Sequence, residues 1–163
     1  MKILTPFLSF VLLIISILVY KKSTYPTLNR QDLKTDYTLI VDRGAFHYDC
    51  FELTIDKISY YPVSTNTPSY TKYHTFSQIA LDTVTTLAFL TEIEAKGFSK
   101  LKDYYSSKTS CTSELSITLF SKGKSKNVIC DDFDRDCPEL IKYIDKMVVT
   151  LEGNNLKRIY LPG

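Results

Sequence analysis

The residues with the greatest capacity for chemistry are four cysteines and a short histidine–cysteine segment. Cys50, Cys111, Cys130 and Cys137 follow one another at intervals of 61, 19 and 7 residues, and none has the C-x-x-C spacing typical of zinc and thioredoxin-like sites. His47 precedes Cys50 by three residues and could act as the base that a nucleophilic thiol needs. On a strand these two side chains would point to opposite faces. We therefore predict a packed cysteine, a surface histidine and no catalytic site, with a small thiol-dependent enzyme using Cys50 and His47 as the alternative.

All four cysteines are candidates for disulfide bonds if the domain is exported, and four cysteines allow three connectivities. With a hairpin turn centred near Gly123, residues whose numbers sum to roughly 246 to 248 would face each other. This favours a bond between Cys111 and Cys137, or between Cys111 and Cys130 if the second strand is out of register. Four reduced thiols are the alternative for a reducing compartment.

An acidic segment is the only candidate for a metal site. Asp132, Asp134 and Asp136 occupy alternate positions, like the first ligands of a calcium-binding EF-hand loop. Cys137 stands where that loop needs glycine, and Tyr143 stands where it needs the last ligand. We predict instead that the carboxylates stabilise the start of a helix, and we expect no metal or other cofactor.

The charge balance excludes a dedicated nucleic-acid-binding protein. The 163 residues carry 20 basic and 18 acidic side chains, a formal charge of +2. Five basic residues but only one acidic residue precede Asp36, namely Lys2, Lys21, Lys22, Arg30, Lys34 and Asp32. The remainder has 15 basic and 17 acidic residues and a formal charge of −2, so no nucleic-acid partner is expected.

Residues 4–20 are uncharged, largely apolar and followed at once by Lys21 and Lys22. Seventeen helical residues extend about 26 Å, close to the roughly 30 Å hydrocarbon core of a bilayer. The bulky residues after this run do not fit a signal-peptidase site. We predict an uncleaved signal anchor at residues 1–22, which makes the membrane one partner, a polar linker at 23–36 and a folded domain at 37–163.

The orientation of this single-pass anchor rests on two opposing signals. The positive-inside rule counts more basic residues after the apolar run than before it and so favours a cytoplasmic domain. Four cysteines in a small domain favour export. We predict that the C-terminal domain is extracytoplasmic, in the periplasm.

The folded part combines strands with two helices. Alternating apolar residues predict strands at 37–41 and from Phe51, with a turn at Asp56–Lys57, and Tyr70 to Phe76 is rich in strand-forming residues. Residues 115–119 and 127–130 are predicted to form a hairpin. Residues 157–161 are a candidate edge strand.

One predicted helix begins near Ser77 or Asp82, ends at Gly97 and has apolar residues around most of its surface, so we expect it to be well buried. A second helix is capped near Asp136 and ends at Gly153. Its apolar stripe is Leu140, Ile141, Ile144, Met147, Val148 and Leu151. We predict an α+β fold in which an antiparallel sheet packs against two helices, preceded by the anchor helix.

Residues 40–150 resemble a family of small, uncharacterised bacterial envelope domains. The resemblance rests on Gly97-Phe98-Ser99-Lys100-Leu101 with Tyr104, on Leu115 to Leu119 with its Gly-Lys turn, on Pro138-Glu139-Leu140 and on Tyr143-Ile144-Asp145. It implies an exported or lipid-anchored protein without a known activity. Ala45, His47 and Phe51 replace a cysteine, a glycine and a proline of the family pattern.

The functional expectation is a membrane-anchored, non-catalytic envelope module that binds a protein or ligand. Tyrosines near the proline-rich segment are candidates for a binding face: Tyr60, Tyr61, Tyr70 and Tyr73.

Overall fold

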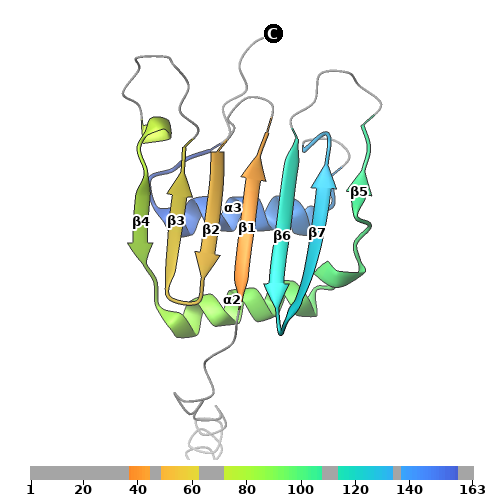
Figure 1. Cartoon of the computed structure of the whole chain (residues 1–163), viewed down its shortest axis with the longest axis horizontal. Helices are drawn as coiled ribbons and strands as arrows, with labels where there is room; N and C mark the ends of the chain where they lie inside the picture. Colours follow the sequence, from red (N-terminus) through yellow and green to blue (C-terminus); the bar gives the residue numbers. More distant parts are fainter. Residues whose placement is uncertain (1–36, 45–48, 63–71, 108–113, 134–136, 158–163) are drawn as a thin grey trace, which may run out of the picture. The chain divides into compact units, whose positions relative to one another are not determined.

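A seven-stranded sheet is the framework of the folded part, with the strand order β4-β3-β2-β1-β6-β7-β5 (Figure 1). The computed structural model describes residues 37–44, 49–62, 72–107, 114–133 and 137–157, all within one compact unit, Thr35–Gly163. The strands are β1 (Thr38–Arg43), β2 (Asp49–Thr54), β3 (Lys57–Tyr61), β4 (Ser77–Ala80), β5 (Tyr104–Tyr105), β6 (Leu115–Ser121) and β7 (Lys124–Cys130). The α+β class is confirmed. The sheet is mixed rather than antiparallel throughout, because the short edge strand β5 pairs in parallel with β7.

The central strands follow the predicted alternation of buried and partly exposed side chains. Leu39 and Val41 of β1 are fully buried, and their register partners on β2 are Leu53 and Phe51. The predicted turn at Asp56 is confirmed, since β2 ends at Thr54 and β3 begins at Lys57. Alternation therefore identifies the face of the sheet that carries the core.

The hairpin of β6 and β7 is also confirmed. Its two turn residues, Lys122 and Gly123, have φ values of 53° and 72°, the left-handed conformation of a tight type I′ hairpin. Leu115 faces Cys130, so facing residue numbers sum to 245. The predicted register of 246 to 248 is wrong because the turn is centred between Lys122 and Gly123.

Two α-helices cover the same face of the sheet and run across its strands (Figure 1). Helix α2 (Thr83–Ala95) begins after Asp82, whose carboxylate accepts a hydrogen bond of 2.8 Å from the Thr85 N–H. Gly97 follows the helix with a φ of 87°, as predicted. The prediction that α2 is buried around most of its surface is wrong, since Val84 is 69% exposed. Its buried residues are Thr86, Phe89, Leu90 and Ile93.

The segment before α2 differs from the prediction. Lys72–His74 is a short 3₁₀ helix, η1, and the strand begins only at Ser77, opposite Tyr60. The predicted strand at 70–76 is therefore wrong over residues 72–76, and Ser77 does not begin a helix. Leu81 then donates a main-chain hydrogen bond of 2.8 Å to Asp56, which places the chain for its turn into α2.

Helix α3 (Glu139–Glu152) ends at Gly153, as predicted, where φ is 83°. It packs on β3 and β4. Its buried face includes Ile141, Ile144 and Val148 from the predicted stripe, and also two charged residues, Asp145 and Glu152. Lys157 is not in a strand, while Asp136 and residues 158–161 lie outside the described residues.

Neither α-helix in the described part of the chain is long and apolar enough to cross a bilayer. The predicted anchor at 1–22 and linker at 23–36 lie outside the described residues.

Candidate functional site

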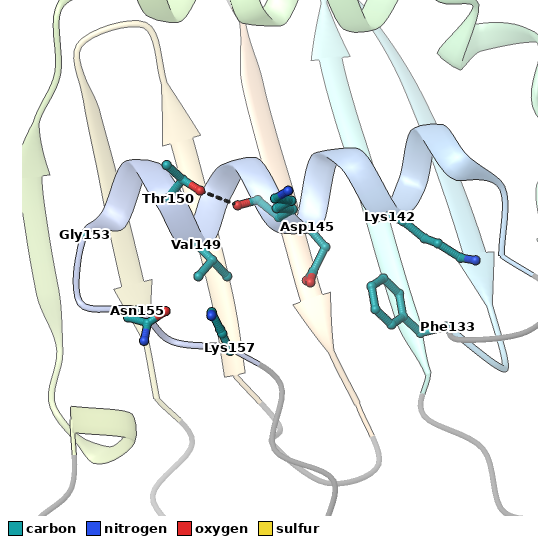
Figure 2. A pocket seen from close by; sticks show the side chains of 9 residues that line it. Phe133, Lys142, Asp145, Val149, Thr150, Gly153, Asn155 and Lys157 are labelled. Atoms are coloured by element: carbon teal, nitrogen blue, oxygen red, sulfur yellow. Dashed lines mark hydrogen bonds between the residues drawn. The ribbon is translucent and has the colours of Figure 1, made fainter.

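A groove of about 510 Å³ runs along the side of α3 (Figure 2), within the usual size range of ligand sites. Figure 2 shows Asp145 and Val149 pointing from α3 toward the chain segment that carries Asn155 and Lys157. Phe133, which follows β7, closes one end. The remaining lining residues are Lys142, Lys146, Thr150 and Gly153.

The wall opposite α3 is the segment that follows Gly153, and hydrogen bonds to its main-chain carbonyls hold it in place. Lys72 Nζ donates to the carbonyls of Asn154 and Asn155 at 2.9 and 2.7 Å. Tyr73 Oη donates to the carbonyl of Lys157 at 3.0 Å. The η1 helix thus positions one side of the groove.

Glu152 fixes the point where α3 passes into that wall. A carboxylate near a helix C-terminus is unfavourable unless it is compensated. Ser77 Oγ donates to Glu152 Oε1 at 2.6 Å, and the side-chain amide of Asn154 donates to the same oxygen at 2.6 Å. The Asn154 N–H donates to Oε2 at 2.9 Å. These bonds satisfy the buried carboxylate and tie β4 to the end of α3.

Beneath the groove, Arg43 is buried together with two carboxylates. Its Nε lies 3.4 Å from Asp49 Oδ1, its register partner on β2, and 3.4 Å from Asp145 Oδ1 on α3. Its Nη2 donates to the carbonyl of Leu156 at 2.7 Å. Its guanidinium carbon lies 4.6 Å from the centre of the Phe51 ring. One arginine therefore joins the sheet, α3 and the wall of the groove.

Tyr60 extends this polar cluster toward η1. Its Oη lies 3.0 Å from Asp49 Oδ2 and 3.0 Å from the carbonyl of Tyr73, so its single proton is donated to one of them at a time. Burial and the charge of Asp49 raise the pKa of Tyr60 far above its ordinary value. The phenol is therefore neutral at physiological pH and acts as a hydrogen-bond donor.

The predicted histidine–cysteine segment is only partly described. Cys50 lies half-buried on the sheet face opposite the helices, with Sγ 3.7 Å from the Phe51 carbonyl, and His47 lies outside the described residues. Burial and the carboxylates of Asp42, Glu52 and Asp49 raise the pKa of Cys50. A nucleophilic cysteine requires the opposite shift, so these surroundings do not favour a thiol-dependent enzyme.

Two of the other cysteines lie together. Cys130 ends β7, Cys137 stands just before α3, and the Cys137 Sγ donates to the Cys130 Sγ at 3.0 Å. No disulfide bond joins two described residues. Cys111 lies outside them, so its predicted pairing stays a prediction.

Only part of the acidic segment lies among the described residues. Asp132 is buried, whereas Asp134 and Asp136 fall outside. No group of three metal-ligating side chains occurs within the described ranges. The calcium site therefore stays an untested alternative.

Three of the four tyrosines that were candidates for a binding face are among the described residues, and these three do not share one surface. Tyr60 is buried in the polar cluster, and the half-buried Tyr73 contributes its main-chain carbonyl to it. Tyr61 is exposed, and its ring centre lies 5.4 Å from that of Phe76. Tyr70 is outside the described residues.

The residues that form the groove were not predicted from the sequence. Lys142, Lys146 and Thr150 recur every fourth residue, which places them along one side of the helix. This spacing is present in the sequence, but the three residues are polar and do not belong to the apolar stripe that predicts the helix. Lys157 and Asn155 carry no comparable signal, because long-range hydrogen bonds from η1 and from Arg43 to main-chain carbonyls bring their segment beside α3.

Comparison of the chain with protein-family models, with curated proteins and with solved structures found no match in any of the three.

Proposed function

We propose that this chain is a membrane-anchored, non-catalytic binding module of the bacterial envelope, and that the groove beside α3 takes an acidic segment of a partner protein. The observation that carries the proposal is a set of three lysines, Lys142, Lys146 and Lys157, placed around a partly apolar groove by two different segments. Such a site matches a peptide with carboxylates at its edges and an apolar side chain at its centre.

The charges of these lysines are available to a partner. Lys142 Nζ lies 3.1 Å from Glu139 Oε1, but the Glu139 side chain is 88% exposed, so this ion pair contributes little. Lys146 and Lys157 are exposed and form no ion pair with another described residue. Asp145 also lines the groove, but Arg43 compensates its charge from behind.

The groove also has an apolar lining, to which Val149 and Phe133 contribute. Val149 is 8% exposed and points from α3 toward Lys157, and the ring of Phe133 closes the other end of the groove (Figure 2). Because hydrogen bonds already hold the wall, binding would order few additional groups. A preformed groove of this kind favours the binding of a short peptide over the binding of a large protein surface.

The location of the module is part of the proposal. The apolar run at 4–20 with its following lysines supports an anchor, and the resemblance to envelope domains supports export. A groove on an anchored, extracytoplasmic domain would meet partners within the envelope.

The test uses the full chain in detergent and a fluorescent peptide in which glutamates flank a central leucine and phenylalanine. We expect salt-sensitive binding, measured by fluorescence anisotropy, that weakens roughly tenfold for each of Lys146→Glu and Lys157→Glu. A peptide with glutamine in place of glutamate should bind much more weakly.

Lys100→Glu and Lys102→Glu are the matched controls, because both lysines are exposed and neither lines the groove. Their affinities should stay within twofold of the original protein. Equal losses in the control and groove variants, or no peptide binding at all, would exclude this groove as the acidic-peptide site.

A further inference from the structure

The contact between Cys130 and Cys137 joins the end of β7 to the segment just before α3. Cys130 is fully buried at the end of β7, facing Leu115, and Cys137 is 6% exposed just before the first turn of α3. Their sulfur atoms are 3.0 Å apart. A disulfide bond of about 2.05 Å requires these sulfurs to approach by only about 1 Å.

We propose that Cys130 and Cys137 are an oxidisable pair that forms a disulfide bond by exchange with a small-molecule disulfide such as oxidised glutathione. The Cys137 thiolate, the more exposed of the two, attacks the glutathione disulfide and releases one glutathione thiolate, which takes up a proton. The Cys130 thiolate then attacks the mixed disulfide and releases the second glutathione. Two protein thiols are oxidised and one glutathione disulfide is reduced to two thiols, so atoms and electrons balance.

The position of Cys50 supports this choice of pair. Cys130 lies on the helix-covered face of the sheet, whereas Cys50 lies on the opposite face of β2. A bond between Cys50 and either member of the pair would have to pass through the sheet. This pairing also differs from both bonds that the sequence favoured, each of which used Cys111.

The proposed bond goes beyond the binding function and has a structural consequence for the groove. Phe133, which closes one end of the groove, lies between the two cysteines in the chain. Oxidation would tie the end of β7 to the start of α3 on either side of that residue. The redox chemistry is tested independently of peptide binding.

Trypsin separates all four cysteines, which makes the pairing directly measurable. Cleavage after lysine and arginine gives peptides 44–57, 109–122, 127–135 and 136–142, each with one cysteine. The full chain is equilibrated in detergent with oxidised glutathione, alkylated, digested and analysed by mass spectrometry. We expect peptide 127–135 joined to peptide 136–142, and the bond should disappear after reduction.

A chain carrying both Cys50→Ser and Cys111→Ser should form the same linked peptides, which separates this pair from the other cysteines. Oxidised protein should also melt about 5–10 °C above reduced protein, because the bond constrains the unfolded chain. Two results would overturn the proposal. One is a bond between peptide 109–122 and either peptide 127–135 or peptide 136–142, and the other is four alkylated cysteines after treatment with oxidised glutathione.

Discussion

Arg43 shows how one buried charge can organise the region beneath a binding groove. It is 1% exposed, and two carboxylates, a main-chain carbonyl and the Phe51 ring surround it. A buried charge is costly unless opposite charges and hydrogen bonds compensate it. Removal of Arg43 would leave Asp49 and Asp145 buried beside each other without that compensation.

We predict that Arg43→Met lowers the free energy of unfolding by about 3–5 kcal/mol, the usual loss when one partner of a buried ion pair is removed. Urea denaturation followed by circular dichroism measures this change. Lys100→Met, at an exposed position, should change the free energy by less than about 0.5 kcal/mol.

A combined variant tests the explanation. If uncompensated charge causes the loss, then adding Asp49→Asn and Asp145→Asn to Arg43→Met should recover part of the stability. A triple variant that is less stable than Arg43→Met alone would show that the arginine acts mainly by packing.

Glu94, near the hairpin turn, makes the stability depend on pH. Burial raises the pKa of Glu94, but hydrogen bonds from Ser121, Tyr37 and Lys122 outweigh that effect and hold the pKa below its usual value. Ser121 Oγ lies 2.5 Å from Oε1, and Tyr37 Oη lies 2.6 Å from Oε2. The folded state therefore favours the ionised carboxylate.

A carboxyl group whose pKa is lower in the folded state stabilises the fold above its unfolded pKa and loses this contribution as the pH falls through its folded pKa. We predict that Glu94→Gln reduces the slope of stability against pH below about pH 4.5. Thermal melts at half-unit intervals from pH 7 to 3 measure that slope. Glu139→Gln, at a highly exposed side chain, is the control, and an unchanged slope in Glu94→Gln would contradict the prediction.

At the level of elements, the sequence predicts the apolar framework better than the polar contacts. Alternation identified β1 and β2, and the Lys122–Gly123 turn identified the hairpin, because local conformation and burial act in the same direction there. The predicted first strand stopped at Val41, although Arg43 occupies the next inward-facing position. No residue near Arg43 in the sequence indicates that Asp145, more than 100 residues away, will compensate the charge of Arg43.

The same reasoning explains the missed strand β4 and the missed groove. Tyr and Thr favour strands, but residues 72–74 instead form η1, whose side chains bond to the carbonyls after α3. These contacts connect segments about 80 residues apart. Long-range hydrogen bonds thus overrode a weak local preference.

The wall of the groove is held by few bonds, and it should loosen when one donor is lost. We predict that Lys72→Met, which removes the bonds to the carbonyls of Asn154 and Asn155, increases amide exchange at Gly153 and Asn154 about fivefold. Loss of about 1 kcal/mol of local stability gives this factor. Hydrogen–deuterium exchange with mass spectrometry measures it.

The control for this experiment is Lys57→Met. Lys57 is a half-buried lysine at the opposite end of β3 from Tyr61. Exchange at Gly153 and Asn154 should not change in that variant. An equal increase in both variants would mean that general destabilisation, rather than the lost bonds, loosens the wall.

At the scale of the whole molecule, both described α-helices lie on the same face of the sheet, and no helix among the described residues covers the other face (Figure 1). Residues on that face, including Ile40, Thr118 and Asn127, are only half-buried among the described residues. Asn127 donates to Ser116 and Thr118 at 2.9 and 2.8 Å. Hydrogen-bonded hydroxyl and amide groups thus make an open face compatible with water.

The proposed anchor gives the last prediction, because compartment decides both the state of the cysteines and the partners that the groove meets. We predict that alkaline phosphatase fused after Gly163 is active in a bacterial host, whereas β-galactosidase fused at the same position is inactive. A chain lacking residues 1–22 should leave the membrane fraction and lose the phosphatase signal. A free-standing phosphatase with its own export signal is the control for secretion. An active β-galactosidase fusion together with an inactive phosphatase fusion would place the domain in the cytoplasm, where a reducing environment opposes the Cys130–Cys137 bond.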